Sequence, residues 1–289
     1  MFLATILAIA LFGFAHNASA QSGLSQPLVS LANSISMSST SFIDSFDSSD
    51  PAKSTNGLYD PAKFQHHGNV GVLNNTGSDL RNAVVFGDLF YSGALAPRNT
   101  TRVEGIIATP YTSTIPWASN PTWIPDATYT GSAAATVKTF VAGSSTSPTR
   151  IKISGDYNVS GGTPVNIVPS AGGGGYIEFW VTGKFNASGG SRILQDPAVH
   201  AAWIVDKDIT TCGDCYRNGS GSSANLSFIA VGTGKVNISG FGNLAGTITA
   251  PERDVAVGGG GALSGGLFGK TLTINGNSSV HCDEELLVP

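Results

Sequence analysis

The stretch that decides the fold runs from Val236 to Val280 and reads VNISGFGNLAGTITAPERDVAVGGGGALSGGLFGKTLTINGNSSV. Apolar residues recur in it with internal spacings of two, eight and twelve residues, and a glycine follows two positions after the second apolar residue of each copy. A period of 17 to 19 residues is typical of a solenoid, in which each repeat buries its apolar side chains against its neighbours. The three copies contain Val236, Ile238, Leu244 and Ile248, then Val255, Val257, Leu263 and Leu267, and finally Leu272, Ile274 and Val280.

The repeat also predicts how its strands stack. Side chains alternate along a strand, so Val236 and Ile238 share one face while Asn237 lies on the other. Parallel coils stack about 4.8 Å apart, which would place Val236 beside Val255 and Leu272 in an inward ladder. Glycine suits the corners, where tight turns need unusual backbone angles. Because parallel crossovers are almost always right-handed, the sequence predicts an all-β fold, a right-handed parallel β-helix.

The chain divides into three expected parts. Residues 1–20 read as a signal peptide, because a short apolar run from Leu3 to Phe14 precedes the small-residue site Ala18-Ser19-Ala20. Residues 21–82 read as a polar N-terminal segment and cap, with a short helix over residues 24–35. Residues 83–289 form the expected β-solenoid domain. Two stretches interrupt its pattern, residues 109–148 and 194–224, and are expected to be loop excursions from the solenoid.

Charge narrows the class of partner. The chain has 12% charged residues and a formal net charge of −4, which disfavours nucleic acid because that ligand needs clustered Lys and Arg. A surface polysaccharide or another envelope component is the expected partner, and no cofactor is predicted. After signal cleavage no apolar stretch of spanning length remains, so we expect a secreted, extracellular or cell-envelope protein.

Three cysteines leave the disulfide pairing open. Cys212 and Cys215 have C-x-x-C spacing and suit a disulfide in an oxidising compartment, while Cys282 could instead pair with either of them. A redox site of this spacing needs a helix after it to lower the pKa of the first thiol. Residues 216–221 are poor helix formers, so a structural disulfide is favoured. A zinc site would need a second pair of ligands at suitable spacing, and no metal site is predicted.

The two ends of the domain show a resemblance to a known family. The opener Ile43–Pro51, with Gly57-Leu58-Tyr59, and the closer Gly276–Leu286 resemble an uncharacterised family of bacterial β-solenoid surface domains. The resemblance implies an envelope or extracellular setting and no established activity. Such domains are often joined to PilX-like pilus-assembly N-termini, and their solenoids are similar to those of polymer-forming bactofilins. In the closer, we expect His281, Asp283 and Glu284 to cap the last coil, because charge at a sheet edge blocks edge-to-edge stacking.

Three functions are compatible with this architecture. A non-catalytic structural or adhesive solenoid is favoured, with Trp117, Trp123 and Trp203 as ligand-binding residues and no catalytic residue assigned. The alternative is a carbohydrate-active β-helix enzyme of the lyase or glycoside hydrolase type, which needs two facing carboxylates within about 10 Å. The third function is ice binding or self-polymerisation. It is disfavoured for ice because the positions equivalent to Thr271 and Thr273 hold other residues in the neighbouring copies.

Overall fold

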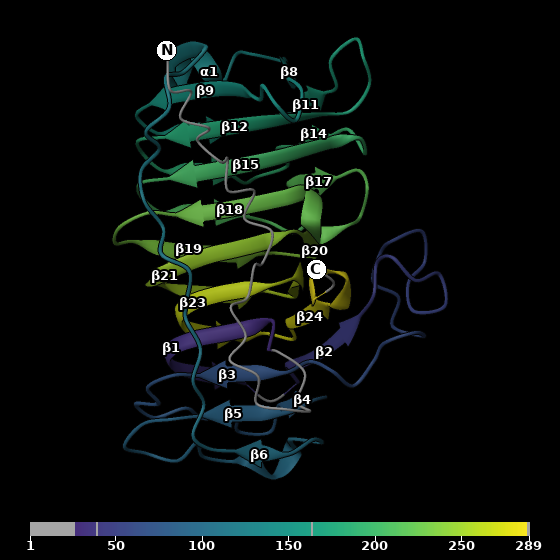
Figure 1. Cartoon of the computed structure of the whole chain (residues 1–289), viewed down its shortest axis with the longest axis vertical. Helices are drawn as coiled ribbons and strands as arrows, with labels where there is room; N and C mark the ends of the chain where they lie inside the picture. The colour runs from purple at the N-terminus through teal and green to yellow at the C-terminus, as the bar shows by residue number, and fades with distance from the viewer. Residues whose placement is uncertain (1–26, 39, 163, 288–289) are drawn as a thin grey trace, which may run out of the picture.

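The computed structural model describes residues 27–38, 40–162 and 164–287. The expected signal peptide therefore lies outside the described residues. The chain is nearly all β, with 47% strand and 5% helix, and its strands pair in parallel. It winds into coils that stack along one axis, as Figure 1 shows. The prediction of a parallel β-helix is confirmed. Within the described ranges, no helix is long and apolar enough to cross a membrane.

The first face of the β-helix extends along the whole stack. Its strands lie in the order β6-β5-β3-β1-β23-β21-β18-β15-β12-β9-β7. The order does not follow the sequence, since the N-terminal β1 lies between β3 and β23. The bounds are β1 Val29–Met37, β3 Val70–Val72, β5 Leu89–Tyr91, β6 Ile107–Ala108, β7 Ala127–Thr130, β9 Thr149–Ser154, β12 Gly175–Val181, β15 Val199–Val205, β18 Leu226–Ala230, β21 Thr247–Gly258 and β23 Leu267–Ile274.

The second face continues around a corner from the first. It consists of β10 Tyr157–Val159, β13 Phe185–Ala187, β16 Ile209–Thr211 and β19 Lys235–Ser239. It then runs into the C-terminal parts of β21, β23 and β1, which are long enough to turn the corner. The short helix α1 (Gly131–Ala134), which follows β7, lies against β10.

The third face is divided into two sheets. One consists of β8 Thr139–Val141, β11 Val165–Val168, β14 Ile193–Gln195 and β17 Tyr216–Asn218. The other consists of β20 Gly242–Ala245, β22 Gly261–Gly265, β24 Ser279–Asp283, β2 Phe42–Phe46 and β4 Val84–Val85. Three short 3-10 helices complete the described elements: η1 Thr100–Arg102, η2 Ser223–Asn225 and η3 Glu284–Leu287.

The predicted inward ladder is confirmed residue by residue. Val236 pairs with Val255, which pairs with Leu272, and all three side chains are at most 1% exposed. The neighbouring positions follow the same register, with Leu244 beside Leu263 and Leu263 beside Val280. Side chains from the three faces therefore fill the interior of the helix, and the core runs along its axis.

The path of the chain divides the helix into two stacks. Residues 27–108, here called the N-terminal stack, and residues 127–287, the C-terminal stack, meet where β1 pairs with β23 and β2 pairs with β24. Residues 109–126, here called the strap, return along one side of the molecule from β6 at one end to β7 at the other (Figure 1). The last coil is thus followed in space by the first.

Several boundaries differ from those expected. The solenoid does not begin at residue 83, because β1, β2 and β3 already form coils in the stack. The helix expected over residues 24–35 is wrong in its described part, since Val29–Met37 form β1. The first excursion is limited to the strap. The second does not exist, because β15, β16 and β17 are regular coils within residues 194–224. Glycine, serine and cysteine in their turns concealed the alternation of these strands.

Candidate functional site

The two motifs at the ends of the domain lie side by side. β2 in the opener pairs in parallel with β24 in the closer, and Asp44 lies directly opposite His281. The loop of residues 47–69 leaves β2 and folds over this pair of strands, because Tyr59 in the loop packs against Phe46 and His281. We call this region, where the N-terminal and C-terminal stacks meet, the junction.

Three side chains in the junction form a hydrogen-bonded relay. His281 Nδ1 lies 2.5 Å from Asp44 Oδ1, and His281 Nε2 lies 2.8 Å from Ser279 Oγ. The tautomer that satisfies both contacts donates from Nδ1 to Asp44 and accepts at Nε2 from Ser279. The exposed fractions of Asp44, His281 and Ser279 are 1%, 3% and 7%. The order serine, histidine, aspartate is that of hydrolases which activate a serine hydroxyl.

The relay is closed to substrates by Tyr59. Its ring stacks on the His281 imidazole with 3.5 Å between centroids, and its hydroxyl donates to Asp44 Oδ2 at 2.7 Å. Burial and this hydrogen bond raise the pKa of Tyr59, so the hydroxyl keeps its hydrogen. A nucleophilic serine must be reached by a substrate carbonyl, and Ser279 is almost entirely buried. The relay therefore acts as an internal lock between β2 and β24.

A second group of contacts joins three segments around Asp283. Asp283 Oδ1 accepts from the Ser48 amide at 2.9 Å, and its Oδ2 accepts from Ser223 Oγ at 2.5 Å. Ser48 Oγ lies 2.7 Å from Asp283 Oδ2 and 2.5 Å from Glu285 Oε2. One hydroxyl hydrogen serves only one of these carboxylates, so the other contact needs a proton on a carboxyl group. Burial raises the pKa of Asp283 by more than its hydrogen bonds lower it. Asp283 is therefore the carboxyl group that is favoured to hold this proton.

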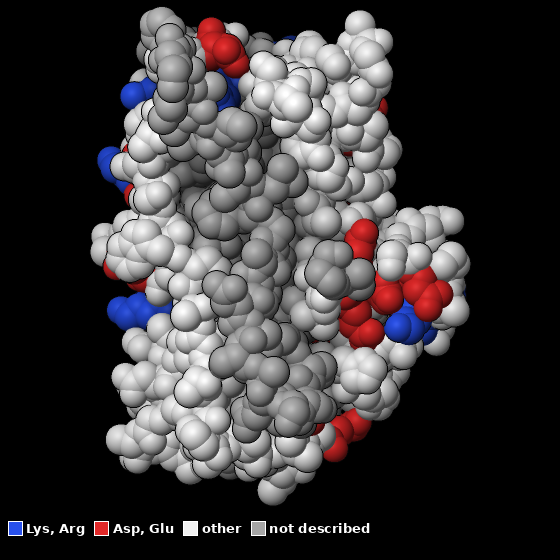
Figure 2. Space-filling model, viewed as in Figure 1, with Lys and Arg blue, Asp and Glu red and all other residues white. Residues whose placement is uncertain are grey.

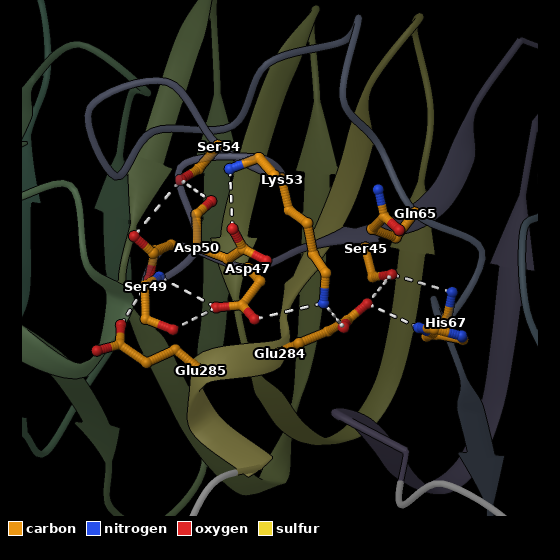
Figure 3. A network of polar contacts seen from close by, with 12 residues as sticks. Ser45, Asp47, Ser49, Asp50, Lys53, Ser54, Gln65, His67, Glu284 and Glu285 are labelled. Carbon is orange, nitrogen blue, oxygen red and sulfur yellow. Dashed lines mark hydrogen bonds and ion pairs between the residues drawn. The ribbon is translucent and has the colours of Figure 1, made fainter.

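The outer part of the junction is an ion-pair network. Glu284 Oε2 lies 3.4 Å from Lys53 Nζ, which lies 3.5 Å from Asp47 Oδ2. Glu284 Oε1 accepts from Ser45 Oγ at 2.8 Å and lies 2.9 Å from His67 Nδ1 (Figure 3). Figure 2 shows Asp and Glu side chains gathered over this side of the molecule, with a basic side chain among them. The carboxylates are thus held by partners within the chain.

The expectation that His281, Asp283 and Glu284 cap an edge is wrong. β24 pairs with β22 on one side and with β2 on the other, so it lies inside the sheet. The charge of these residues does not face an open edge, because the N-terminal stack continues the helix. His281, Asp283 and Glu284 bind residues of the opener and its loop instead.

The cysteines adopt the pairing expected from the C-x-x-C spacing. Cys212 and Cys215 form a disulfide, and Cys282 is free and buried. The disulfide closes the turn between β16 and β17, and the strand Tyr216–Asn218 follows it where a redox site would need a helix. Burial raises the pKa of the Cys282 thiol, which keeps it unreactive. Among the described residues, no group of three His, Cys, Asp or Glu is arranged to hold a metal ion.

The tryptophans expected to bind ligand lie in three different settings. Trp203 is 0% exposed and stacks on Phe179 inside the core with 3.9 Å between ring centroids, so its assignment to a ligand surface is wrong. Trp123 is half-buried and packs edge-on against Trp180 at 6.3 Å, which ties the end of the strap to β12. Trp117, in the middle of the strap, is 68% exposed.

The second face carries an outward polar row rather than a threonine ladder. The register places different residue types next to one another along this row, so the regular threonine spacing of an ice-binding surface is not present in its paired strands. The row runs through Asn158, Asn186, Thr210, Asn237, Ala256 and Thr273.

The fold and the junction define a parallel β-helix whose first and last coils are locked together by polar side chains. The chain belongs to the family described as a domain of unknown function, DUF7305, which it matches over residues 129–287. The match covers the C-terminal stack with the closer and begins after the strap. No curated protein matches the sequence. Asp44, Ser48 and Ser279 were missed by sequence reasoning; the alternation of β2 and β24 was visible, but not their pairing.

Proposed function

We propose that this protein is a non-catalytic structural or adhesive β-solenoid of the cell surface or extracellular space, and that the strap is its contact surface. The observation that carries the proposal is the exposure of two large apolar side chains on the strap. Trp117 is 68% exposed and Ile124 is 86% exposed. Apolar side chains grouped on one exposed segment favour an interaction site, whereas single ones scattered over a surface do not.

The strap presents these side chains from a backbone that is held at both ends. At one end, the Tyr111 hydroxyl lies 3.0 Å from Ser30 Oγ, and its ring stacks on Phe90. Gly71 makes room for this ring, because a Cβ there would lie 2.3 Å from a Tyr111 carbon. At the other end, Trp123 packs against Trp180. A fixed backbone lowers the entropy lost on binding.

The chemistry of the strap favours a polysaccharide partner. An exposed indole offers a flat apolar face and one N–H donor, which suits the alternating apolar faces and hydroxyl groups of sugars. The strap holds one charged residue, Asp126, at its end, so a neutral polymer fits it better than a charged one. The resemblance to bacterial surface domains with PilX-like N-termini and bactofilin-like solenoids supports an envelope setting for such a ligand.

The junction supports a binding role over the carbohydrate-active enzyme alternative. Asp283 and Glu285 share Ser48 and are close enough for a glycosidase pair. However, Asp283 is 0% exposed and is bound on both oxygens by residues of its own chain. A sugar cannot lie between two carboxylates that are joined by a serine.

Binding to a glycan array and to insoluble cell-wall polysaccharide tests the proposal. We expect Trp117→Ala to weaken binding at least about tenfold, which corresponds to about 1.4 kcal/mol. Phe241→Ala is the matched control, because Phe241 is 83% exposed in the turn between β19 and β20 and should leave binding unchanged. Unchanged binding by Trp117→Ala, or turnover of a polysaccharide by the wild-type protein, would overturn the proposal.

A further inference from the structure

We propose that the N-terminal stack also docks on the C-terminal stack of a second copy of this chain, giving a two-fold dimer in which the two chains exchange N-terminal stacks. In the dimer each junction is built from both chains, with Asp44 from one copy and His281 from the other. The partner is a second copy because its C-terminal stack offers the same strand edge and the same side chains as the chain's own.

The contacts of the junction are independent of chain connectivity. β1 pairs with β23 and β2 pairs with β24, yet neither pair is joined by a turn. The polar contacts from Asp44 to His281 and from Ser48 to Asp283 likewise connect residues more than 230 positions apart, with separations of 237 and 235. An exchanged stack makes every one of these contacts unchanged, which is the condition for domain swapping.

The C-terminal stack needs a cover on this edge. Without the N-terminal stack, β23 and β24 would present unpaired backbone N–H and C=O groups and the end of the apolar core. An open edge of this kind pairs with any strand of suitable register. The N-terminal stack of the same chain and that of a second copy cover this edge equally well. The length and stiffness of the strap therefore determine which of the two binds there.

The strap is almost as short as it can be in the monomer. It has to pass from β6 to β7, which are the ends of an order of eleven strands and therefore ten steps apart. Ten steps of about 4.8 Å amount to about 48 Å. The strap has eighteen residues, and a fully extended chain of that length reaches about 60 Å. The monomer therefore holds the strap at roughly four fifths of its full extension, with little slack.

The composition of the strap fits this extended course. It contains Pro110, Pro116, Pro121 and Pro125. Proline and the residue before it favour extended backbone, so the strap acts as a semi-rigid spacer and not as a loose loop. Short connections under strain between two docking units favour exchange over closure within one chain.

The exchanged dimer relaxes this constraint. If two C-terminal stacks lie side by side and antiparallel, the β7 end of one lies beside the β23 end of the other. The N-terminal stack adds four steps beyond β23, so the strap then spans about 19 Å along the axis together with one lateral crossing. Two such exchanges close with two-fold symmetry and leave no open junction.

Cross-linking between chains tests the exchange directly. Ser36 and Thr273 are opposite one another in β1 and β23 and lie on the outer side of the helix. Neighbouring strands bring such residues within the range that a disulfide requires. Full-length Ser36→Cys and Thr273→Cys chains with different tags are co-expressed, purified and oxidised. We expect a disulfide-linked heterodimer, present in proportion to the dimer seen by light scattering after gel filtration.

Two controls keep the result interpretable. The double variant Ser36→Cys with Thr273→Cys should cross-link within the monomer, which shows that the cysteine pair has suitable geometry. Co-expressed Thr210→Cys and Asn237→Cys chains should give no heterodimer, since both residues lie in the C-terminal stack. Insertion of ten Gly/Ser residues after Ser113 should shift the protein toward monomer, and deletion of Thr112 to Thr114 should shift it toward dimer.

The outcomes separate clearly. A heterodimer whose yield rises with strap deletion supports the exchange. If the double variant cross-links but the mixed single variants do not, and the strap-deletion variant remains monomeric at high concentration, the proposal is overturned. The proposal is also overturned if light scattering detects a dimer but the Ser36–Thr273 pair does not cross-link in it. The two copies would then associate through another surface.

Discussion

Asp44 Oδ1 and His281 Nδ1 lie 2.5 Å apart in paired strands, although 237 residues separate them in the sequence. Both side chains are buried, so each of these two atoms depends on the other for its hydrogen bond. We expect His281→Ala to lower the free energy of unfolding by about 3–5 kcal/mol, because it leaves the buried Asp44 carboxylate without this partner. Urea denaturation followed by circular dichroism measures the change.

His66→Ala provides the comparison for this loss. His66 also contacts a carboxylate, that of Glu104, but its side chain is 57% exposed. Its removal should cost less than about 1 kcal/mol. Equal losses for the two variants would mean that the Asp44–His281 contact does not lock the junction.

Ser279 should not react as a nucleophile. The relay has the residue order of a hydrolase, but Tyr59 covers the imidazole and Ser279 is 7% exposed. We expect no labelling of the folded protein by a fluorophosphonate probe, in wild type or in Ser279→Ala. Labelling that Ser279→Ala abolishes would show that the relay opens and is catalytic. Tyr59→Ala tests the cover itself, since labelling only in that variant would show that Tyr59 is what keeps the serine closed.

The raised pKa of Asp283 predicts a dependence of stability on pH. Burial raises the pKa of Asp283, so the folded protein holds the proton of this carboxyl group more tightly than the unfolded chain does. The stabilisation is complete below the unfolded carboxyl pKa of about 3.9, and it is lost as the pH rises through the higher folded value. We expect the stability of wild type relative to Asp283→Asn to fall as the pH is raised above about 4.

Urea denaturation of both proteins across this pH range gives the difference curve. Glu104→Gln is the control, because Glu104 is 46% exposed and should give no comparable slope. Parallel curves for wild type and Asp283→Asn would show that Asp283 holds no proton at the junction.

The interior of the β-helix could be predicted from sequence, but the order of its coils could not. The spacing of Val236, Val255 and Leu272 predicts the inward ladder, because local alternation and repeat length determine which side chains face inward. The local sequence of β1 and β23 does not indicate that they pair with one another, since any coil of this pattern could accept either strand. The relay of Asp44 and His281 depends on that pairing. Trp203 was misplaced for a related reason, as the polar turns around β15 concealed its inward alternation.

Arg253 should be among the most sensitive positions in the C-terminal stack. Its side chain is 0% exposed and lies at the irregularity of β21 between Ala250 and Asp254. The guanidinium donates to backbone carbonyls in the turns of two preceding coils, those of Val205, Lys207, Val231 and Gly232. Arg253→Met removes these donors from three partly buried carbonyls and from that of Val205, which still accepts from the Val231 amide. A carbonyl that loses its donor costs about 1–3 kcal/mol where water does not replace it. We expect a loss of at least about 3 kcal/mol in the free energy of unfolding.

Arg253→Lys should recover only part of it, because an ammonium group lacks the planar fork of donors. Arg217→Met, at a side chain that is 51% exposed, is the control for loss of a positive charge. A small effect of Arg253→Met would mean that water replaces the guanidinium at these turns, and that the corner of the helix does not depend on this side chain.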